Sequence, residues 1–140
     1  MIPLLAGILV MAWAQPEPAL NPAQVVRIVV DALRSNNAPL PNAGIFTTYR
    51  FSSPANRAIT GPYGNFLRIV KHPDFAPLLR ESNQSVGSIH SDGNRARQVV
   101  QTRGSNGQSV DYEFVLTRQA SGPCTNCWMV DGVSRLDAGR

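Results

Sequence analysis

The sequence lacks the short motifs that mark common catalytic sites. Its 140 residues contain no Gly-X-Ser-X-Gly nucleophile elbow, no glycine-rich phosphate loop and no paired-histidine metal motif. Only two histidines and two cysteines are present. A structural zinc site needs four such ligands, and His72 and His90 lie far from the cysteines in sequence. We therefore predict no catalytic residue, no metal site and no cofactor, and a surface role is the simpler interpretation of both histidines.

Lysine is nearly absent, and the basic charge is dispersed. Thirteen Lys and Arg residues against nine Asp and Glu residues give a net charge of +4, and Lys71 is the one lysine. Proteins that bind nucleic acid usually concentrate basic residues on one element, and only Arg95, Arg97 and Arg103 come close to that pattern. We therefore expect no nucleic-acid partner, although the positive charge permits an anionic one.

Only the N-terminus contains a long uninterrupted run of apolar residues. Residues 2–12 are uncharged and almost wholly apolar, and Ala12-Trp13-Ala14 precedes Gln15. This small-x-small pattern is typical of a secretion signal, whereas a membrane-spanning helix needs about 20 apolar residues. We predict a signal peptide over 1–14, export to the periplasm or the medium, and no membrane span. A buried N-terminal helix is the alternative. The run departs from the usual signal-peptide pattern in having no Lys or Arg ahead of it.

The chain then changes from linker to helix. Residues 15–21 contain two prolines and predict a short extended linker, followed by a single domain over 22–140. Asn21-Pro22-Ala23-Gln24 supplies an N-cap, a proline for the first helical position and a capping-box glutamine. Val and Leu recur at helical spacing over 25–33, so we predict a helix that ends near Ser35.

The middle third is less periodic. Ile45–Phe51 and Tyr63–Lys71 are predicted to be helical. The stretch that begins at Ser53 is either a loop or a further turn of helix, ended by Thr60-Gly61-Pro62. Phe75–Leu79 is predicted to be a short apolar plug on the core.

From Gln84 onward the hydrophobic period is two. The alternation over 110–117 is typical of a half-buried antiparallel strand. A strand over 94–102 precedes it, and Gly104-Ser105-Asn106-Gly107 joins the two as a hairpin turn. Further strands are predicted at 85–90 and 127–134. This order predicts an α+β fold, with N-terminal helices packed on a curved four-stranded antiparallel sheet.

The two cysteines are spaced to form a disulfide across a turn. In an exported protein, Cys124 and Cys127 are more often bonded than free, and residues i and i+3 of a β-turn lie close enough to bond. A redox centre is the alternative. It would place the first cysteine at a helix N-terminus, whereas a strand is predicted to follow here. We expect the pair to staple a hairpin.

A segment within the helical half is dense in hydrogen-bonding side chains. Its members are Arg50, Ser53, Asn56, Arg57 and Thr60. They predict a pocket that recognises an anion, because Arg binds carboxylates and phosphates in a bidentate manner. The alternative is that these groups cap helix ends and join a loop to the sheet.

Two residues of the last predicted strand are further candidates to bind a ligand. Trp128 has a simpler interpretation as a core residue whose indole N–H is bonded internally. Asp131, beside Gly132, is suited to pair with an arginine from the helical half.

Three blocks of sequence carry a resemblance to a known family. They are Arg50–Arg57 with Thr60-Gly61-Pro62, then Phe75–Leu79, then Cys127–Val133. In this order they resemble a bacterial and plastid family defined only as a domain of unknown function, over roughly Pro22 to Val133. The resemblance implies a cystatin-like, or nuclear-transport-factor-like, cone in which a curved sheet wraps around a helix. It implies no particular activity.

Two functions follow as hypotheses. The first is an exported, non-catalytic binding or interaction module for a small anionic or amphipathic ligand or a protein partner. The second is a small pocket enzyme of the isomerase or lyase type, by analogy with other cone folds. Such an enzyme needs an acid and a base that face one cavity, and the candidates are Tyr49, Tyr63, Asp74 and Asp131.

Overall fold

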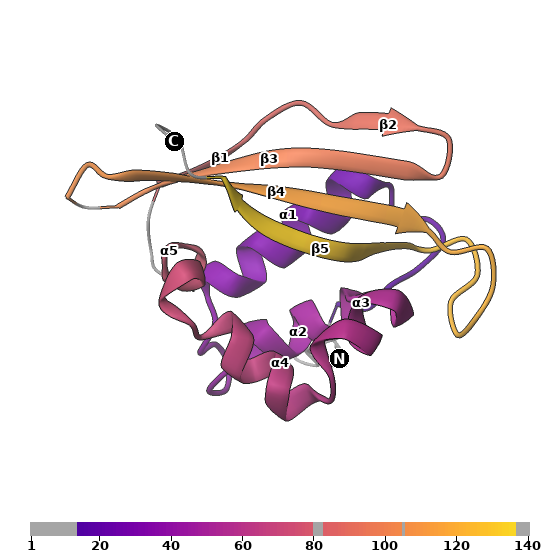
Figure 1. Cartoon of the computed structure of the whole chain (residues 1–140), viewed down its shortest axis with the longest axis horizontal. Coiled ribbons are helices and arrows are strands. Elements are labelled where there is room, and N and C mark those ends of the chain that lie inside the picture. Colours follow the sequence, from indigo (N-terminus) through magenta and orange to yellow (C-terminus); the bar gives the residue numbers. More distant parts are fainter. Residues whose placement is uncertain (1–13, 80–82, 105, 137–140) are drawn as a thin grey trace, which may run out of the picture.

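The helices lie on one side of the molecule and an antiparallel sheet on the other (Figure 1). The computed structural model describes residues 14–79, 83–104 and 106–136. The helices are α1 (Pro22–Arg34), α2 (Ala43–Phe51), α3 (Pro54–Thr60), α4 (Tyr63–Val70), the 3₁₀ helix η2 (Pro73–Phe75) and α5 (Ala76–Leu79). The strands are β1 (Asn83–Val86), β2 (His90–Asp92), β3 (Arg95–Arg103), β4 (Ser109–Arg118) and β5 (Trp128–Leu136). The predicted α+β class is confirmed.

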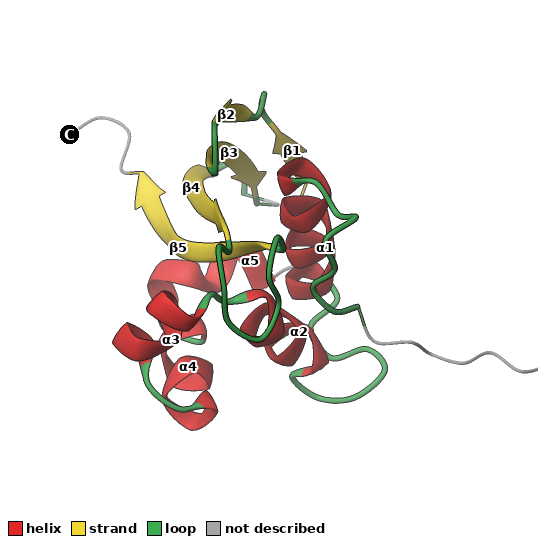
Figure 2. Cartoon of the chain, turned by 90° about the vertical axis from the view of Figure 1, so that its right-hand side faces the viewer, coloured by secondary structure: helices red, strands yellow, loops and turns green. Residues whose placement is uncertain are grey.

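Helix α1 begins with the predicted capping box. The backbone N–H of Gln24 donates to Asn21 Oδ1, and the N–H of Asn21 donates to Gln24 Oε1, both at 2.8 Å. The apolar stripe of the helix is buried: it consists of Val25, Val26, Val29, Val30 and Leu33. This stripe belongs to the same core as the buried side chains of β3 and β4, and α1 runs along one face of the sheet (Figure 2).

A glycine brings α2 into close contact with α1. A Cβ atom at Gly44 would lie 1.9 Å from the carbonyl oxygen of Ala32, so only glycine fits there. Asn36 holds the turn between the two helices: its Oδ1 accepts from the N–H of Ile45 at 2.8 Å and its carbonyl accepts from the N–H of Gly44 at 3.0 Å. Position 44 therefore sets where α2 lies.

The stretch that begins at Ser53 is helical rather than a loop. Ser53 is the N-cap of α3, and its Oγ accepts from the N–H of Asn56 at 3.1 Å. Gly61 ends this helix with a φ of +82°, a conformation that favours glycine. The predicted apolar plug is the pair η2 and α5, in which Leu78 is buried.

The sheet has five strands, not the four that were predicted. Its order is β1-β3-β4-β5, and β2 also pairs with β3. Val86 pairs with Val100 and His90 with Arg97, so three residues of the edge strand face two of β3. This extra residue forms a bulge, which divides the predicted 85–90 strand into β1 and β2. Gln98 stabilises the break by donating from Nε2 to the carbonyl of Gly87 at 2.7 Å.

The two faces of the sheet differ. Alternate residues of β3 and β4 face the core and are buried, and they are Ala96, Gln98, Val100, Thr102, Val110, Tyr112, Phe114 and Leu116. The sheet curves, and the helices lie toward this face (Figure 2). In the described part of the chain, no helix covers the opposite face.

The predicted disulfide joins Cys124 and Cys127. Their Cα atoms are 5.5 Å apart, the N–H of Cys127 donates to the carbonyl of Cys124 at 3.2 Å, and β5 follows at once. The N-terminal segment packs against this turn, with the carbonyl oxygen of Pro16 3.6 Å from Cys124 Sγ. The stretch predicted to be an extended linker thus contacts the domain, and it turns at Glu17, whose carbonyl accepts from the N–H of Leu20 at 3.1 Å.

The predicted signal peptide lies almost wholly outside the described residues, which begin at Ala14. Within residues 14–79, 83–104 and 106–136, no helix has both the length and the apolar character needed to cross a membrane.

Candidate functional site

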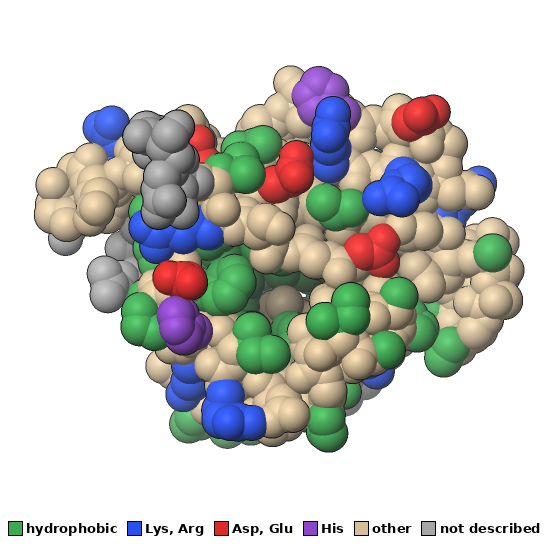
Figure 3. All heavy atoms as spheres, in the orientation of Figure 1, with side chains coloured by type: hydrophobic (Ala, Val, Ile, Leu, Met, Phe, Trp, Pro, Cys, Tyr) green, Lys and Arg blue, Asp and Glu red, His purple; other side chains and the backbone are tan. Residues whose placement is uncertain are grey.

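An apolar hollow lies between β5 and the helices. Its volume is about 150 Å³, and Figure 3 shows the surface hollowed between the sheet and the helices, with hydrophobic side chains gathered around the depression. The apolar part of its wall consists of Leu33, Phe66, Ile69, Val70, Phe75, Leu78, Val130, Gly132 and Val133. Thr48, Ser52, Asn56 and Thr60 supply the polar part, so the described residues of the wall include no titratable side chain.

The junction of α2 and α3 is fastened to β5 beside this hollow. The N–H of Ser53 donates to the carbonyl of Val130 at 2.8 Å, and Ser52 forms a parallel bridge with the same residue. Asn56 Nδ2 donates to Ser52 Oγ at 2.7 Å and lies 3.4 Å from the carbonyl oxygen of Val130. These bonds hold the polar side of the hollow in place.

Two of the predicted ligand-binding residues, Asn56 and Thr60, line the hollow. The hydroxyl of Thr60 donates to the carbonyl of Asn56 at 3.2 Å. The amide nitrogen of Asn56 donates to Ser52 Oγ. Its Oδ1 accepts no hydrogen bond from any residue that the structure describes. This oxygen is therefore available to accept from the hydroxyl or amide group of a ligand. Ser53, by contrast, serves as the cap of α3.

The two predicted arginines make structural contacts instead. Arg57 lies over the ring of Tyr49, with Cζ 4.3 Å from the ring centroid. Its Nη2 donates to the carbonyls of Tyr49 and Arg50, at 2.7 and 3.3 Å, which satisfies the C-terminal end of α2. Arg50 donates to Gln15 Oε1 at 2.8 Å and lies 5.9 Å from the ring centroid of Phe46. Neither arginine lines the hollow.

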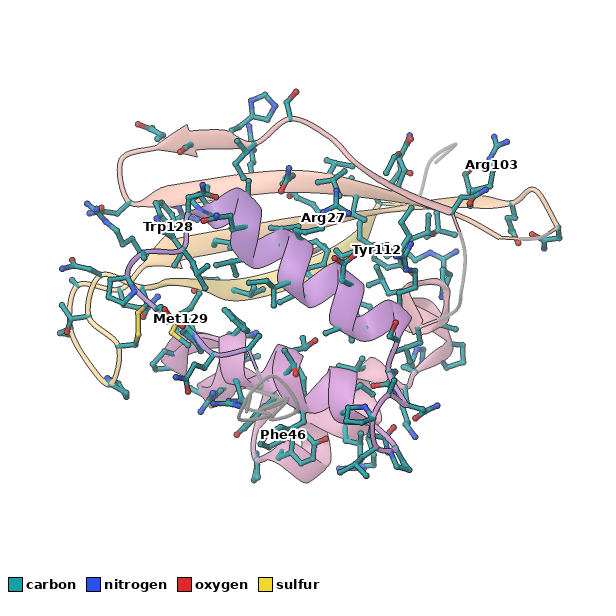
Figure 4. All side chains as sticks on the ribbon, turned by 180° about the vertical axis from the view of Figure 1, so that it is seen from behind. Arg27, Phe46, Arg103, Tyr112, Trp128 and Met129 are labelled. Atoms are coloured by element: carbon teal, nitrogen blue, oxygen red, sulfur yellow. A yellow bond between two sulfur atoms is a disulfide. The ribbon has the colours of Figure 1, made fainter. Side chains whose placement is uncertain are left out.

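The two candidates on β5 also lie away from the hollow. Asp131 is the extra residue of a bulge, because Val130 pairs with Leu116 and Gly132 with Val115. Its carboxylate accepts a hydrogen bond from the hydroxyl of Thr117, and no arginine in the described residues forms an ion pair with it, contrary to the expectation. Trp128 is half-buried at the edge of the core, as expected (Figure 4), although its indole N–H makes no hydrogen bond to a described residue.

The tyrosines proposed as general acids belong to an aromatic cluster. Tyr63 packs edge-on against Phe46 and Tyr49, with ring centroids 5.6 and 5.3 Å apart, and Tyr49 packs in the same way on Phe66. Burial raises the pKa of the Tyr63 phenol. Of the four residues, only Phe66 reaches the wall of the hollow.

A shallower groove of about 560 Å³ adjoins the hollow. The two share Thr60, Ile69 and Phe75, and the rest of the groove is lined by Ile59, Asn65, Arg68, His72 and Asp74. Sequence reasoning missed Arg68, although its position near the end of the predicted Tyr63–Lys71 helix, just before His72, was a usable signal.

Polar contacts order the side chains of this groove. Arg68 Nη2 donates to Asn65 Oδ1. His72 Nδ1 accepts from the N–H of Asp74 at 3.1 Å and lies 3.5 Å from that residue's Oδ2. Because Nδ1 is an acceptor, the neutral His72 ring carries its proton on Nε2 and can donate from there.

Comparison with protein-family models, curated proteins and solved structures finds no match for this chain. The family resemblance and the cone fold that it implies therefore stay predictions. The described residues contain no group of three or more His, Cys, Asp or Glu side chains that could hold a metal ion.

Proposed function

We propose that the protein is an exported, non-catalytic binding module that holds a small amphipathic ligand in the hollow beneath β5. The observation that carries the proposal is the hollow itself, which has apolar walls, an amide oxygen available on one side and no titratable group in its described lining. A cavity of about 150 Å³ with apolar walls is large enough for a benzene molecule. The enclosed part of the ligand therefore has about six carbon atoms.

The chemistry of the wall favours binding over catalysis. A general acid or base must lie within about 3 Å of the proton that it transfers. Tyr49 and Tyr63 are engaged in the aromatic cluster, Asp131 is hydrogen-bonded to Thr117, and Asp74 lines the outer groove. Among the described residues that line the hollow, there is no pair of an acid and a base, so the isomerase or lyase hypothesis has no support there.

The disulfide supports the exported location. Disulfides persist in oxidising compartments and are rare in reducing ones, and Cys124 and Cys127 are bonded here.

Filling the hollow from its own wall tests the proposal. Val133 lines the hollow from β5, so Val133→Phe should occupy part of the space. Val115→Phe is the matched control, because Val115 lies on the neighbouring strand β4 and lines a depression on the opposite face of the sheet. Both variants are first checked for a folded far-UV circular dichroism spectrum.

The probe is 1-hexanol, and binding is followed by amide chemical shifts. We expect hexanol to shift resonances of residues 48–60 and 66–78 in the wild type and in Val115→Phe, and Val133→Phe to lose at least tenfold in affinity. If hexanol shifts none of these resonances in the wild type, or if Val133→Phe binds it as well as the control does, the proposal is wrong.

A further inference from the structure

We infer that the ligand is a small monocarboxylate, with its apolar tail in the hollow and its carboxylate on Arg68 in the adjoining groove. The inference rests on the proposed function and adds the chemical class and the orientation of the ligand. It follows from the shape of the paired depressions, the charges in the groove and the volume of the hollow.

The two depressions adjoin and share part of their lining. Thr60, Ile69 and Phe75 belong to both, and in our proposal the ligand extends past these residues from the hollow into the groove. Ile59 and Ile69 lie at this exit, and Ile59 is 83% exposed. Isolated exposed apolar residues are ordinary, but two at the mouth of an apolar hollow extend the surface that a tail can contact.

Arg68 supplies the positive charge in the groove. Its guanidinium is hydrogen-bonded to the neutral amide of Asn65, and no carboxylate in the described residues forms an ion pair with it. Arg binds carboxylates through two parallel N–H donors, so it can take up an anion while one donor stays on Asn65. His72, just beyond the end of α4, lines the same groove.

Asp74 limits the ligand to one negative charge. Its carboxylate lines the groove beside His72, with 3.5 Å between Oδ2 and Nδ1. The side chain of Arg135 approaches the same residue, with Nη1 3.5 Å from the backbone oxygen of Asp74. Arg68 and Asp74 carry the two opposite charges in the lining of the groove, and Arg135 brings a further positive charge beside Asp74. A monoanion therefore has a cationic partner in Arg68, whereas the carboxylate of Asp74 repels the second charge of a phosphate monoester.

The volume of the hollow sets the length of the tail. Since about 150 Å³ accommodates a benzene-sized group, a six-carbon chain or a phenyl ring fills it. Hexanoate, with a five-carbon tail beyond its carboxylate and six carbons in all, is therefore a suitable probe, and hexanamide is its uncharged analogue of nearly the same shape.

Isothermal titration of hexanoate and hexanamide tests the head group. We expect the wild type to bind hexanoate about tenfold more tightly than hexanamide, the scale of a hydrogen bond to a charged group. Arg68→Met should remove this preference while hexanamide still binds. Arg27→Met is the control. Arg27 lies on α1 (Figure 4), and its replacement changes the net charge by the same amount. Asp74→Asn should strengthen hexanoate binding.

The possible failures are distinguishable. If the wild type binds hexanoate and hexanamide equally, or if Arg68→Met keeps the preference, the carboxylate assignment is wrong and the proposed binding in the hollow stands. If the wild type binds neither probe and hexanol shifts no resonance of the hollow, the proposed function fails as well.

Discussion

Replacing Gly44 with alanine should force apart the two helices that support the polar wall of the hollow. The added Cβ would lie 1.9 Å from the oxygen of Ala32, 2.7 Å from its carbonyl carbon and 2.9 Å from the Cα of Asn36. All three are backbone atoms, so no side-chain rotation relieves the clash. Because ordinary contact begins near 3.4 Å, α1 and α2 must separate by about 1.5 Å.

Two opposing effects determine how much Gly44→Ala changes the free energy of unfolding. Alanine is a better helix former than glycine by about 1 kcal/mol. Against this, overpacking of a well-packed interior costs about 1–3 kcal/mol and more where backbone must move. The separation also weakens two hydrogen bonds to Asn36, from the N–H groups of Gly44 and Ile45, each of which contributes about 1 kcal/mol. The steric effect prevails, and we expect a net loss of about 3 kcal/mol in the free energy of unfolding.

Urea denaturation followed by circular dichroism measures this loss. Gly64→Ala is the matched control, because Gly64 also lies within a helix, α4, and a Cβ there meets nothing within 4 Å. With no clash, only the propensity remains, so Gly64→Ala should stabilise the protein by up to about 1 kcal/mol. The two midpoints should therefore move in opposite directions. Equal or parallel shifts would show that the contact between α1 and α2 is not as close as described.

Two further predictions concern the disulfide and the aromatic cluster. Reduction of the Cys124–Cys127 bond should lower the free energy of unfolding by about 2 kcal/mol, because so short a loop constrains the unfolded chain only slightly, and native protein should not react with a thiol reagent until it is reduced; rapid reaction beforehand would contradict the bond. Tyr63 should ionise above the usual value of 10.0, because burial raises the pKa of its phenol. The folded state then holds this proton more tightly than the unfolded chain does, so its contribution to stability is full below about pH 10 and is lost as the pH rises through the folded pKa. The difference in tyrosinate absorbance between the wild type and Tyr63→Phe isolates this titration, and a midpoint at or below the usual value would refute it.

Local signals in the sequence were sufficient for most of the elements. The capping box at Asn21 fixed the start of α1, and the alternation over 110–117 identified β4, because each depends on neighbours a few residues away. The division of the edge strand into β1 and β2 was not predictable in this way. It arises where the chain pairs with Val100 and Arg97, which lie in another strand.

Prediction of the candidate site from the sequence was limited in a similar way. The density of polar groups around Arg50 and Arg57 suggested an anion pocket. In the structure Arg50 donates to Gln15, and Arg57 donates to the carbonyl of Tyr49 and lies over the ring of that residue. Asn56 and Thr60 reach the hollow only because the junction of α2 and α3 is bonded to Val130, more than seventy residues later in the sequence. A hollow formed by segments so far apart leaves no local pattern to recognise.

Independent attachments around the hollow explain why it does not collapse. Tyr112 donates to the carbonyl of Asp74 at 2.6 Å and holds η2 against the sheet, while Ser53 holds the start of α3 against β5. Gly44 fixes α2 on α1. The residues around a hollow lack packing partners, which costs about 24 cal/mol per Å³ in measured cavities. For about 150 Å³ the cost is about 4 kcal/mol. A ligand tail restores those contacts, and so would the ring of Val133→Phe. If that variant is more stable than the wild type and no longer binds hexanol, the chain keeps the hollow at the expense of its own stability, as expected of a binding site.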